Sequence, residues 1–188
     1  MKNKVKELDR VARQIARCTK CPLSRGRMHT VPGDGNPNAE LVFVGEAPGY
    51  YEDQQGKPFV GRAGKLLEKL LSGIGLRRSD VFICNVVKCR PPENRDPSQE
   101  EIDTCEPYLV RQLEIIQPKV ICALGRYAAQ TLLRTNRGIN ALRGEFYRYR
   151  DIPLLPTLHP AAVLRNASRL GDVEKDFQLL ADTLKERS

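Results

Sequence analysis

Long apolar runs are scarce in this sequence of 188 residues. Its apolar stretches, such as residues 41–44, are about four to six residues long, whereas a membrane-spanning helix needs about 20. The N-terminal segment has neither the apolar core nor the small-residue cleavage site of a signal peptide. No internal repeat or low-complexity tract interrupts the chain. We therefore expect a cytoplasmic protein without membrane association, in which thiols stay reduced.

The composition is that of a globular protein with an excess of basic residues. Hydrophobic residues make up 40% and charged residues 29%, and 31 Lys+Arg against 23 Asp+Glu give a formal net charge of +8. A chain of this length buries roughly 70% of its unfolded surface and needs no disulfide scaffold. We expect a single domain over residues 1–188 and a polyanionic partner such as nucleic acid.

Strand patterns alternate with helix patterns along the chain. Continuous apolar runs predict strands over 40–44, 81–87, 119–124 and 152–157. Apolar side chains at helical spacing predict helices over 4–17, 62–75, 126–134 and 170–185. A further helix is expected to open with Asp96 as its N-cap and to be kinked or divided by Pro107. This order predicts an α/β fold, a three-layer α/β/α sandwich with a central, mostly parallel four-stranded sheet.

Six cysteines are the unusual feature of the composition. Cys18 and Cys21 form a C-x-x-C pair, Cys89 follows a predicted strand, and Cys105 lies in a predicted helix. Four thiolates brought to one point would hold zinc or an iron–sulfur cluster, and the spacing does not decide between them. The alternative is that these are scattered core cysteines. The remaining two lie inside apolar strands and are expected only to pack: Cys84 and Cys122.

A glycine-rich segment, residues 45–64, follows the first predicted strand and leads into a helix. Glycine allows backbone amides to approach a ligand closely, and the start of a helix favours anions. The segment is not a P-loop, because Leu66 follows Lys65 where Ser or Thr is required. The pair Gly33 and Gly35 lacks a third glycine, so the dinucleotide-binding fingerprint fails as well.

Three side chains stand out near the predicted strand ends, where open α/β sheets bind ligands. Asn85 is an amide inside an apolar strand, Phe59 lies in a Gly/Pro-rich loop, and His159 follows the last strand. Each has a structural alternative: the amide could satisfy a loop carbonyl, the ring could anchor the core, and the imidazole could cap the next helix. His29, the other histidine, lies in a polar loop and is expected to be solvent-exposed.

Together these segments resemble the family 4, thermostable-type uracil-DNA glycosylases of bacteria and archaea. The resemblance extends from Cys18 to about Arg165, and its motifs are GEAPGYYEDQQGKPFVGRAGKLL (45–67), NVVKCRPPENRDP (85–97), CEPYL (105–109) and TLHPAAVLR (157–165). It implies a [4Fe–4S] cluster held by four cysteines: Cys18, Cys21, Cys89 and Cys105. It also implies a uracil pocket formed by the backbone of Gly45, Glu46 and Ala47 together with Phe59, Asn85 and His159.

The chain departs from other branches of that superfamily at two places. Other branches carry an aspartate where Ala47 stands, which leaves the water-activating group open. A covalent uracil-binding branch carries a basic loop with a reactive histidine after the Asn-bearing strand. Here Lys88 leads directly into Cys89 without a histidine, so we do not expect covalent chemistry.

The activity implied is hydrolysis of the N-glycosidic bond of uracil in single- or double-stranded DNA, which leaves an abasic site and starts base excision repair. The uracil must first be flipped from the stack, and negative charge develops on it as it departs. His159 is expected to donate to uracil O2 and Phe59 to stack on the ring. The Asn85 amide is expected to donate to O4 and accept from N3–H, the opposite of the pattern that cytosine presents.

Further roles are expected at the rim of this pocket. Glu46 or Glu52 would orient water or stabilise the sugar cation, and Glu52 could also crowd C5 and reject thymine. The alternative for Glu52 is a solvated charged run with Asp53. Leu164 is the expected wedge that fills the gap left by the flipped base, unless it is a buried helix side chain, and Arg165 would contact a flanking phosphate.

The expected protein is therefore a monomeric enzyme that acts on uracil-containing DNA. A non-catalytic, metal-stabilised nucleic-acid-binding module is the alternative that the same charge and cysteines would permit. A redox protein is disfavoured, because no flavin motif is present.

Overall fold

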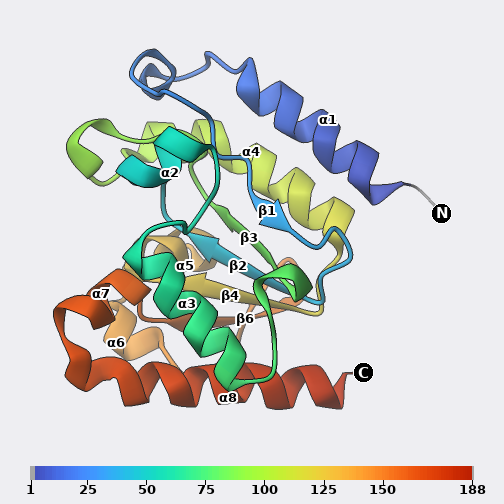
Figure 1. Ribbon diagram of the computed structural model, residues 1–188, viewed down its shortest axis with the longest axis vertical. Coiled ribbons are helices and arrows are strands. Elements are labelled where there is room, and N and C mark those ends of the chain that lie inside the picture. The colour runs from blue at the N-terminus through green and yellow to red at the C-terminus, as the bar shows by residue number, and fades with distance from the viewer. Residues whose placement is uncertain (1–2, 188) are drawn as a thin grey trace.

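The computed structural model describes residues 3–187 and shows a six-stranded mixed sheet between layers of helices (Figure 1). The strand order is β1-β3-β2-β4-β6-β5. The four central strands run parallel: β3 (Phe82–Asn85), β2 (Leu41–Gly45), β4 (Val120–Leu124) and β6 (Ile152–Thr157). Two short strands pair antiparallel at the edges: β1 (Asp34–Gly35) and β5 (Tyr147–Tyr149). The predicted α/β fold class is confirmed, but the sheet has six strands and not the expected four, because β1 and β5 extend the four parallel strands at the two edges.

In the described part of the chain, eight α-helices connect and cover these strands: α1 (Lys4–Ala16), α2 (Tyr50–Gln55), α3 (Arg62–Gly73), α4 (Gln99–Ile116), α5 (Arg126–Leu133), α6 (Ile139–Leu142), α7 (Pro160–Arg165) and α8 (Leu170–Glu186). Helices α4 and α5 pack on one face of the sheet, and α3, α7 and α8 pack on the other. Helix α1 lies against the outer side of α4 (Figure 1). None of the helices within residues 3–187 is long and apolar enough to cross a membrane.

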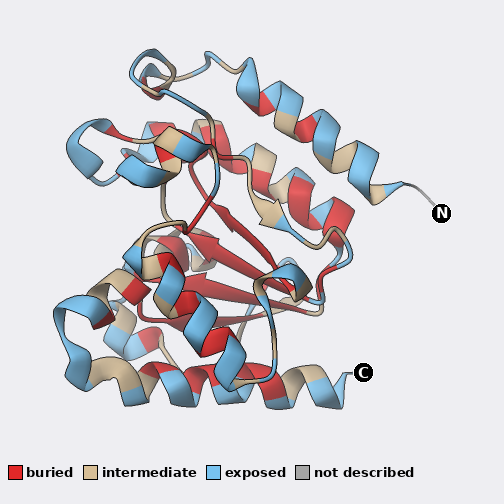
Figure 2. Ribbon diagram, viewed as in Figure 1, coloured by how far each residue is buried: buried red, intermediate tan, exposed pale blue. Residues whose placement is uncertain are grey.

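The central strands are buried on both faces, which explains their continuous apolar sequences (Figure 2). On β2, Val42 and Val44 belong to the core beneath α4 and α5. Their neighbours Leu41 and Phe43 belong to the opposite core, where Phe43 stacks on Phe177 of α8 with ring centroids 5.5 Å apart. Alternate side chains of one strand therefore supply both cores.

Helix α4 differs from the sequence-based prediction in two respects, its N-cap and the effect of its proline. Its N-cap is Ser98 and not Asp96, because Ser98 Oγ accepts from the Glu101 N–H at 3.2 Å while Glu101 Oε2 accepts from the Ser98 N–H at 2.8 Å. Pro107 does not divide the helix, which runs unbroken through it. Pro107 is exposed, so water can reach the carbonyl that lacks its N–H partner, while buried side chains on both sides of the proline hold α4 on the sheet.

Candidate active site

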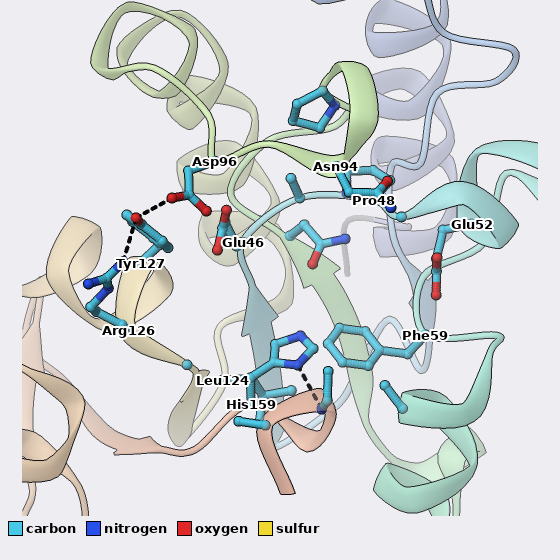
Figure 3. A pocket seen from close by; sticks show the side chains of 18 of the residues that line it. Glu46, Pro48, Glu52, Phe59, Asn94, Asp96, Leu124, Arg126, Tyr127 and His159 are labelled. Carbon is cyan, nitrogen blue, oxygen red and sulfur yellow. Dashed lines mark hydrogen bonds between the residues drawn. The ribbon is translucent and has the colours of Figure 1, made fainter. Parts of the chain in front are cut away.

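A cavity of about 640 Å³ opens at the carboxyl ends of the parallel strands (Figure 3). One lining residue comes from the end of each strand: Glu46 follows β2, Asn85 ends β3, Gly125 follows β4 and His159 lies two residues after β6. Parallel sheets bind ligands at this edge, because loops of several strands converge there. The cavity thus lies where the alternation of strands and helices predicts a ligand.

Most of the predicted pocket residues meet in this cavity. Its lining includes Glu46, Ala47, Glu52, Phe59, Asn85, His159 and Arg165. Gly45 lies directly beneath, at the end of β2. Leu164 is not part of the lining and lies on α7 with 41% of its surface exposed, so it is not a buried helix side chain. Arg165 is exposed as well, and its positive charge lies at the same end of the cavity as His159.

The Asn85 amide lies over a position that only glycine can occupy. Gly45 and Asn85 are paired across β2 and β3, and a Cβ on Gly45 would lie 2.4 Å from Asn85 Oδ1 and 3.0 Å from Phe59 Cε2. Within residues 3–187, the Asn85 side chain makes no hydrogen bond to the protein. It does not satisfy a loop carbonyl, and its donor and acceptor are available to a ligand in the cavity.

The backbone beneath Asn85 is held by an unusual lysine. Lys88 is fully buried, and its Nζ donates to the Asn85 carbonyl at 2.6 Å and to Gln112 Oε1 at 2.7 Å. Gln112 in turn donates to the Pro32 carbonyl at 2.6 Å. A buried ammonium group needs such partners, and here they fix the turn that follows β3.

Phe59 is held in place by its backbone. Its φ of +51° is unusual for a bulky residue and costs of order 1–3 kcal/mol. The Arg78 guanidinium donates to the carbonyls of Phe59 at 2.9 Å and of Pro58. Gly64 allows α3 to approach, because a Cβ there would lie 1.8 Å from the Phe59 carbonyl oxygen. The surrounding structure thus keeps the ring at the cavity wall.

His159 both caps a helix and faces the cavity. Its Nδ1 accepts from the Ala161 N–H at 3.0 Å at the start of α7, which leaves Nε2 to carry the proton. Burial, with a smaller contribution from the positive charge of Arg165, lowers the pKa of His159 to about 4. At neutral pH the imidazole is therefore an uncharged donor through Nε2.

Glu46 lies in an environment that disfavours its charge. The pKa of Glu46 is raised to about 7, mainly by burial and also by the negative charge of Asp96, while the positive charge of Arg126 acts in the opposite direction. Asp96 accepts from the Tyr127 hydroxyl, which itself accepts from Arg126 Nη2 at 2.5 Å (Figure 3). A carboxyl group with a pKa near neutrality can exchange a proton at physiological pH.

Sequence reasoning missed the group of Asp96, Arg126 and Tyr127. The sequence pattern predicts only a helix cap for Asp96 and a place within a helix for Arg126 and Tyr127. The available signal was position for two of them, because Arg126 and Tyr127 come directly after the carboxyl end of β4, whereas Asp96 reaches the cavity only through the fold of the long segment after β3.

The two acidic residues of α2 are not a solvated run. Glu52 is half-buried at the cavity wall, and its Oε1 accepts from the Val60 N–H at 3.3 Å. Asp53 is 4% exposed and its Oδ1 accepts from the backbone N–H groups of Met28 at 2.9 Å and His29 at 3.3 Å. The His29 side chain is exposed, as expected.

The four cysteines proposed as ligands lie together at one corner, where the loop after α1 meets residues 89–105. Arg27 Nη1 donates to Cys89 Sγ at 3.3 Å and to the Cys18 carbonyl at 2.8 Å. The Lys88 N–H donates to Cys105 Sγ at 3.3 Å, and burial raises the pKa of Cys105 to about 11, with Cys89 and Cys21 adding to the rise. This set of four nearby thiols suits iron or zinc. In the part of the chain that is described, however, no three such groups stand in a metal-ligating arrangement.

The other two cysteines, Cys84 and Cys122, are completely buried in β3 and β4, where they pack in the core. No disulfide joins any of the six cysteines, all of which lie within residues 3–187.

Comparison with known proteins agrees with this geometry. The profile of the Uracil DNA glycosylase superfamily matches residues 32–185. The type-4 uracil-DNA glycosylase of Archaeoglobus fulgidus is 47% identical over 186 residues, which cover 95% of this chain and 94% of that protein. That of Thermotoga maritima is 46% identical over 173 residues, covering 88% and 90%. The resemblance seen in the sequence is confirmed, and the chain belongs to the type-4 uracil-DNA glycosylase family.

Proposed function

We propose that this chain is a uracil-DNA glycosylase that hydrolyses the bond between uracil and deoxyribose in single- and double-stranded DNA. The observation that carries the proposal is the meeting of three groups at one cavity: the unpaired Asn85 amide, the neutral His159 and the Phe59 ring. The family relationship supports the same reaction. In this proposal the product is an abasic site that enters base excision repair.

Recognition of uracil follows from the donors and acceptors of the cavity. The Asn85 amide donates to uracil O4 and accepts from N3–H, while the ring lies on Phe59. The backbone of Gly45, Glu46 and Ala47 forms the floor at the end of β2. Cytosine offers the opposite pattern at its N3 and N4 and leaves the amide unpaired, which costs ~1–3 kcal/mol per contact.

Departure of uracil requires stabilisation of the negative charge that it gains. In our proposal the Nε2–H of His159 donates to uracil O2, and this hydrogen bond strengthens as the glycosidic bond breaks. A neutral donor suits this role, because its Nδ1 lone pair is already committed to the Ala161 N–H and fixes the tautomer.

Glu46 is the proposed group that positions water against the sugar. Its carboxylate would accept a proton from water and place negative charge near the sugar cation. Glu52 lies on the opposite side of the cavity in this view, on α2, and is proposed to crowd C5 of the base (Figure 3). In this proposal Glu46 and Glu52 supply the carboxylates of the site, because Ala47 stands where other branches carry an aspartate.

Binding of DNA is proposed to use the exposed residues of α7. Leu164 would fill the gap left by the flipped base, and Arg165 would contact a neighbouring phosphate. The net charge of +8 favours a polyanion. We also propose that residues 1–188 act as one domain and as a monomer, in the cytosol where bacterial and archaeal DNA resides.

We propose that the four neighbouring cysteines bind a [4Fe–4S] cluster. Its ligands would be Cys18, Cys21, Cys89 and Cys105. When bound, the cluster would supply a structural cross-link between the loop after α1 and residues 89–105. Arg27 and the Lys88 amide would then donate hydrogen bonds to ligand sulfurs. The arrangement of the four thiols supports this proposal through their proximity and not through ligating geometry.

A uracil-containing oligonucleotide tests the proposal. Incubation with the purified protein in a metal chelator should yield strands that alkali cleaves at the uracil position, and a thymine-containing strand of the same sequence should stay intact. Binding of both strands without an alkali-labile product would instead indicate a non-catalytic nucleic-acid-binding module.

A further inference from the structure

Helix α2 presents two aromatic rings to solvent beside the cavity. Tyr50 is 50% and Tyr51 62% exposed, although most large apolar side chains of the described chain are buried. The residues on either side of this pair, Gly49 and Glu52, line the cavity. The active-site mechanism uses neither tyrosine.

A cation supports one of these rings. The Arg90 guanidinium lies 5.1 Å from the centroid of the Tyr50 ring, and Arg90 Nε donates to Asn94 Oδ1 at 2.7 Å. Asn94 lines the cavity. The rings of Tyr50 and Tyr51 meet edge to face, with centroids 5.4 Å apart and planes at 83°. The pair is thus connected to the cavity wall and retains large exposed surfaces.

Although α2 has only six residues, it is firmly attached to the molecule. The buried Asp53 carboxylate holds the backbone of residues 28 and 29, and His29 Nδ1 lies 2.9 Å from the Asp53 carbonyl oxygen. Gly56 ends the helix with a φ of +69° and a hydrogen bond to the Glu52 carbonyl at 2.8 Å. A platform fixed in this way loses little conformational entropy when a ligand stacks on it.

The charge around the rings suits a polyanion. Arg90 lies beside Tyr50, Arg62 begins α3 next to the loop of Phe59, and Arg165 lines the cavity. Among residues 3–187, none of these three arginines forms an ion pair. Unpaired cations beside exposed aromatic rings are the combination with which proteins hold single-stranded nucleic acid.

We propose that Tyr50 and Tyr51, with Arg90 behind the first ring, form a stacking subsite for an unpaired base next to the uracil in single-stranded DNA. The subsite deepens the proposed function and rests on it, because the uracil in the cavity brings the neighbouring base to α2. A base in a duplex is already stacked on its neighbours, so the subsite favours single-stranded over duplex substrate. Stacking accepts any base, since each has a π face.

Two measurements on single-stranded DNA test this subsite. The first is the Kd of a thymine-only oligonucleotide, measured by fluorescence anisotropy. The second is the fluorescence of 2-aminopurine placed on the 5′ or the 3′ side of 2′-fluoro-2′-deoxyuridine, which resists hydrolysis. The variants are the double changes Tyr50→Ala/Tyr51→Ala and Tyr50→Phe/Tyr51→Phe, with Phe146→Ala as the control, since Phe146 is another exposed aromatic residue outside the cavity lining.

The alanine pair should weaken binding of the single strand about tenfold, within the range known for base–aromatic stacking. It should also relieve quenching of 2-aminopurine in at least one of the two oligonucleotides. The phenylalanine pair and Phe146→Ala should behave as the wild type, because stacking needs the rings and not the hydroxyl groups. Duplex binding should change less than single-strand binding.

A wild-type Kd together with unchanged 2-aminopurine fluorescence in the alanine pair would overturn the subsite. An unchanged thermal midpoint shows that the exposed substitutions leave the fold intact. If the wild-type protein excised no uracil, the proposed function would fail, yet the thymine-only measurement would still decide whether the tyrosines stack on DNA.

Discussion

The rings of Phe59 and His159 stack on one another, with centroids 5.4 Å apart and planes at 27°. One ring comes from the loop before α3 and the other from the first residue before α7, so two distant segments form one wall of the cavity. Each ring is also fixed independently, Phe59 by Arg78 and His159 by the Ala161 N–H. The wall is therefore preorganised before a base enters.

Substitution of His159 should separate its two functions. His159→Ala removes the cap of α7 and should cost about 1 kcal/mol of stability. His159→Asn keeps a good N-cap residue, so its stability should approach that of the wild type. Both variants lack the Nε2 donor and should lose about a hundredfold or more in single-turnover excision. Thermal unfolding and excision of uracil measure the two effects, and full activity of His159→Asn would contradict the donor role.

Removal of the Asn85 amide should affect selectivity more than binding. Asn85→Ala should lose about ten- to hundredfold in preference for uracil for each contact removed. Its affinity for a strand without uracil should stay unchanged, because the side chain lies inside the cavity. Competition between uracil- and cytosine-containing strands measures the preference. An equal loss of affinity for all strands would count against recognition by the amide.

The raised pKa of Glu46 predicts an ascending pH profile. Its carboxylate forms as the pH rises through about 7, so the single-turnover rate should rise through the same range. Asp96→Asn removes a neighbouring negative charge, lowers the pKa of Glu46 and should move the midpoint to lower pH. His159, with a pKa of about 4, should add no inflection near neutrality. A wild-type profile in Glu46→Gln would dismiss Glu46 as the base.

The same group should make stability depend on pH. The folded-state pKa of Glu46, about 7, exceeds its ordinary value of 4.5, so the folded protein holds this proton more tightly than the unfolded chain. Stability from this group is therefore fully present below about pH 4.5 and is lost progressively as the pH rises from there through about 7. Glu46→Gln should flatten that loss in urea titrations at several pH values.

Substitution of one of the four proposed ligand cysteines should lower the iron content, whereas substitution of a core cysteine should not. Cys89→Ser should reduce iron content and the visible absorption of the purified protein, and should destabilise the loop after α1. Cys122→Ser, a change inside β4, serves as the control and should retain the iron. Absence of both iron and zinc from the wild-type protein would refute the metal site.

Truncation of Leu164 should distinguish duplex from single strand. The side chain is 41% exposed beside the cavity, so Leu164→Ala should leave stability nearly unchanged. Excision from duplex DNA should fall more than excision from single strands, because only the duplex has a gap to fill. Equal rates for the two substrates relative to wild type would dismiss the wedge.

The parallel sheet was predictable because its strands are buried on both faces and read as continuous apolar runs. The edge strands β1 and β5, of two and three residues, are too short to produce a pattern. Ser98 and Asp96 are both good helix caps, and the choice depends on Glu101, which bonds the Ser98 N–H and the Arg95 guanidinium at once. The N-cap is therefore determined by side-chain contacts in the folded protein and not by the capping preference of either residue.

The candidate site, like the fold, was predictable from the sequence only in part. Asn85 and His159 were predictable because each is polar at the end of an apolar strand. The influence of Asp96 on Glu46 was not, because it arises only when the turns after β2 and β3 fold to the same side of the sheet. Contacts between loops carry no periodicity from which they could be predicted.

The attachment of α2 through Asp53 has a practical consequence for redesign. The Asp53 carboxylate accepts a hydrogen bond from the Met28 N–H, while the Met28 side chain is 58% exposed. A substitution at position 28 should therefore keep this hydrogen bond unless the new residue is proline, which has no N–H to donate to Asp53. Position 28 offers an attachment point next to α2 for a cross-linker, a fluorophore or a varied library, without a change to any residue that lines the cavity.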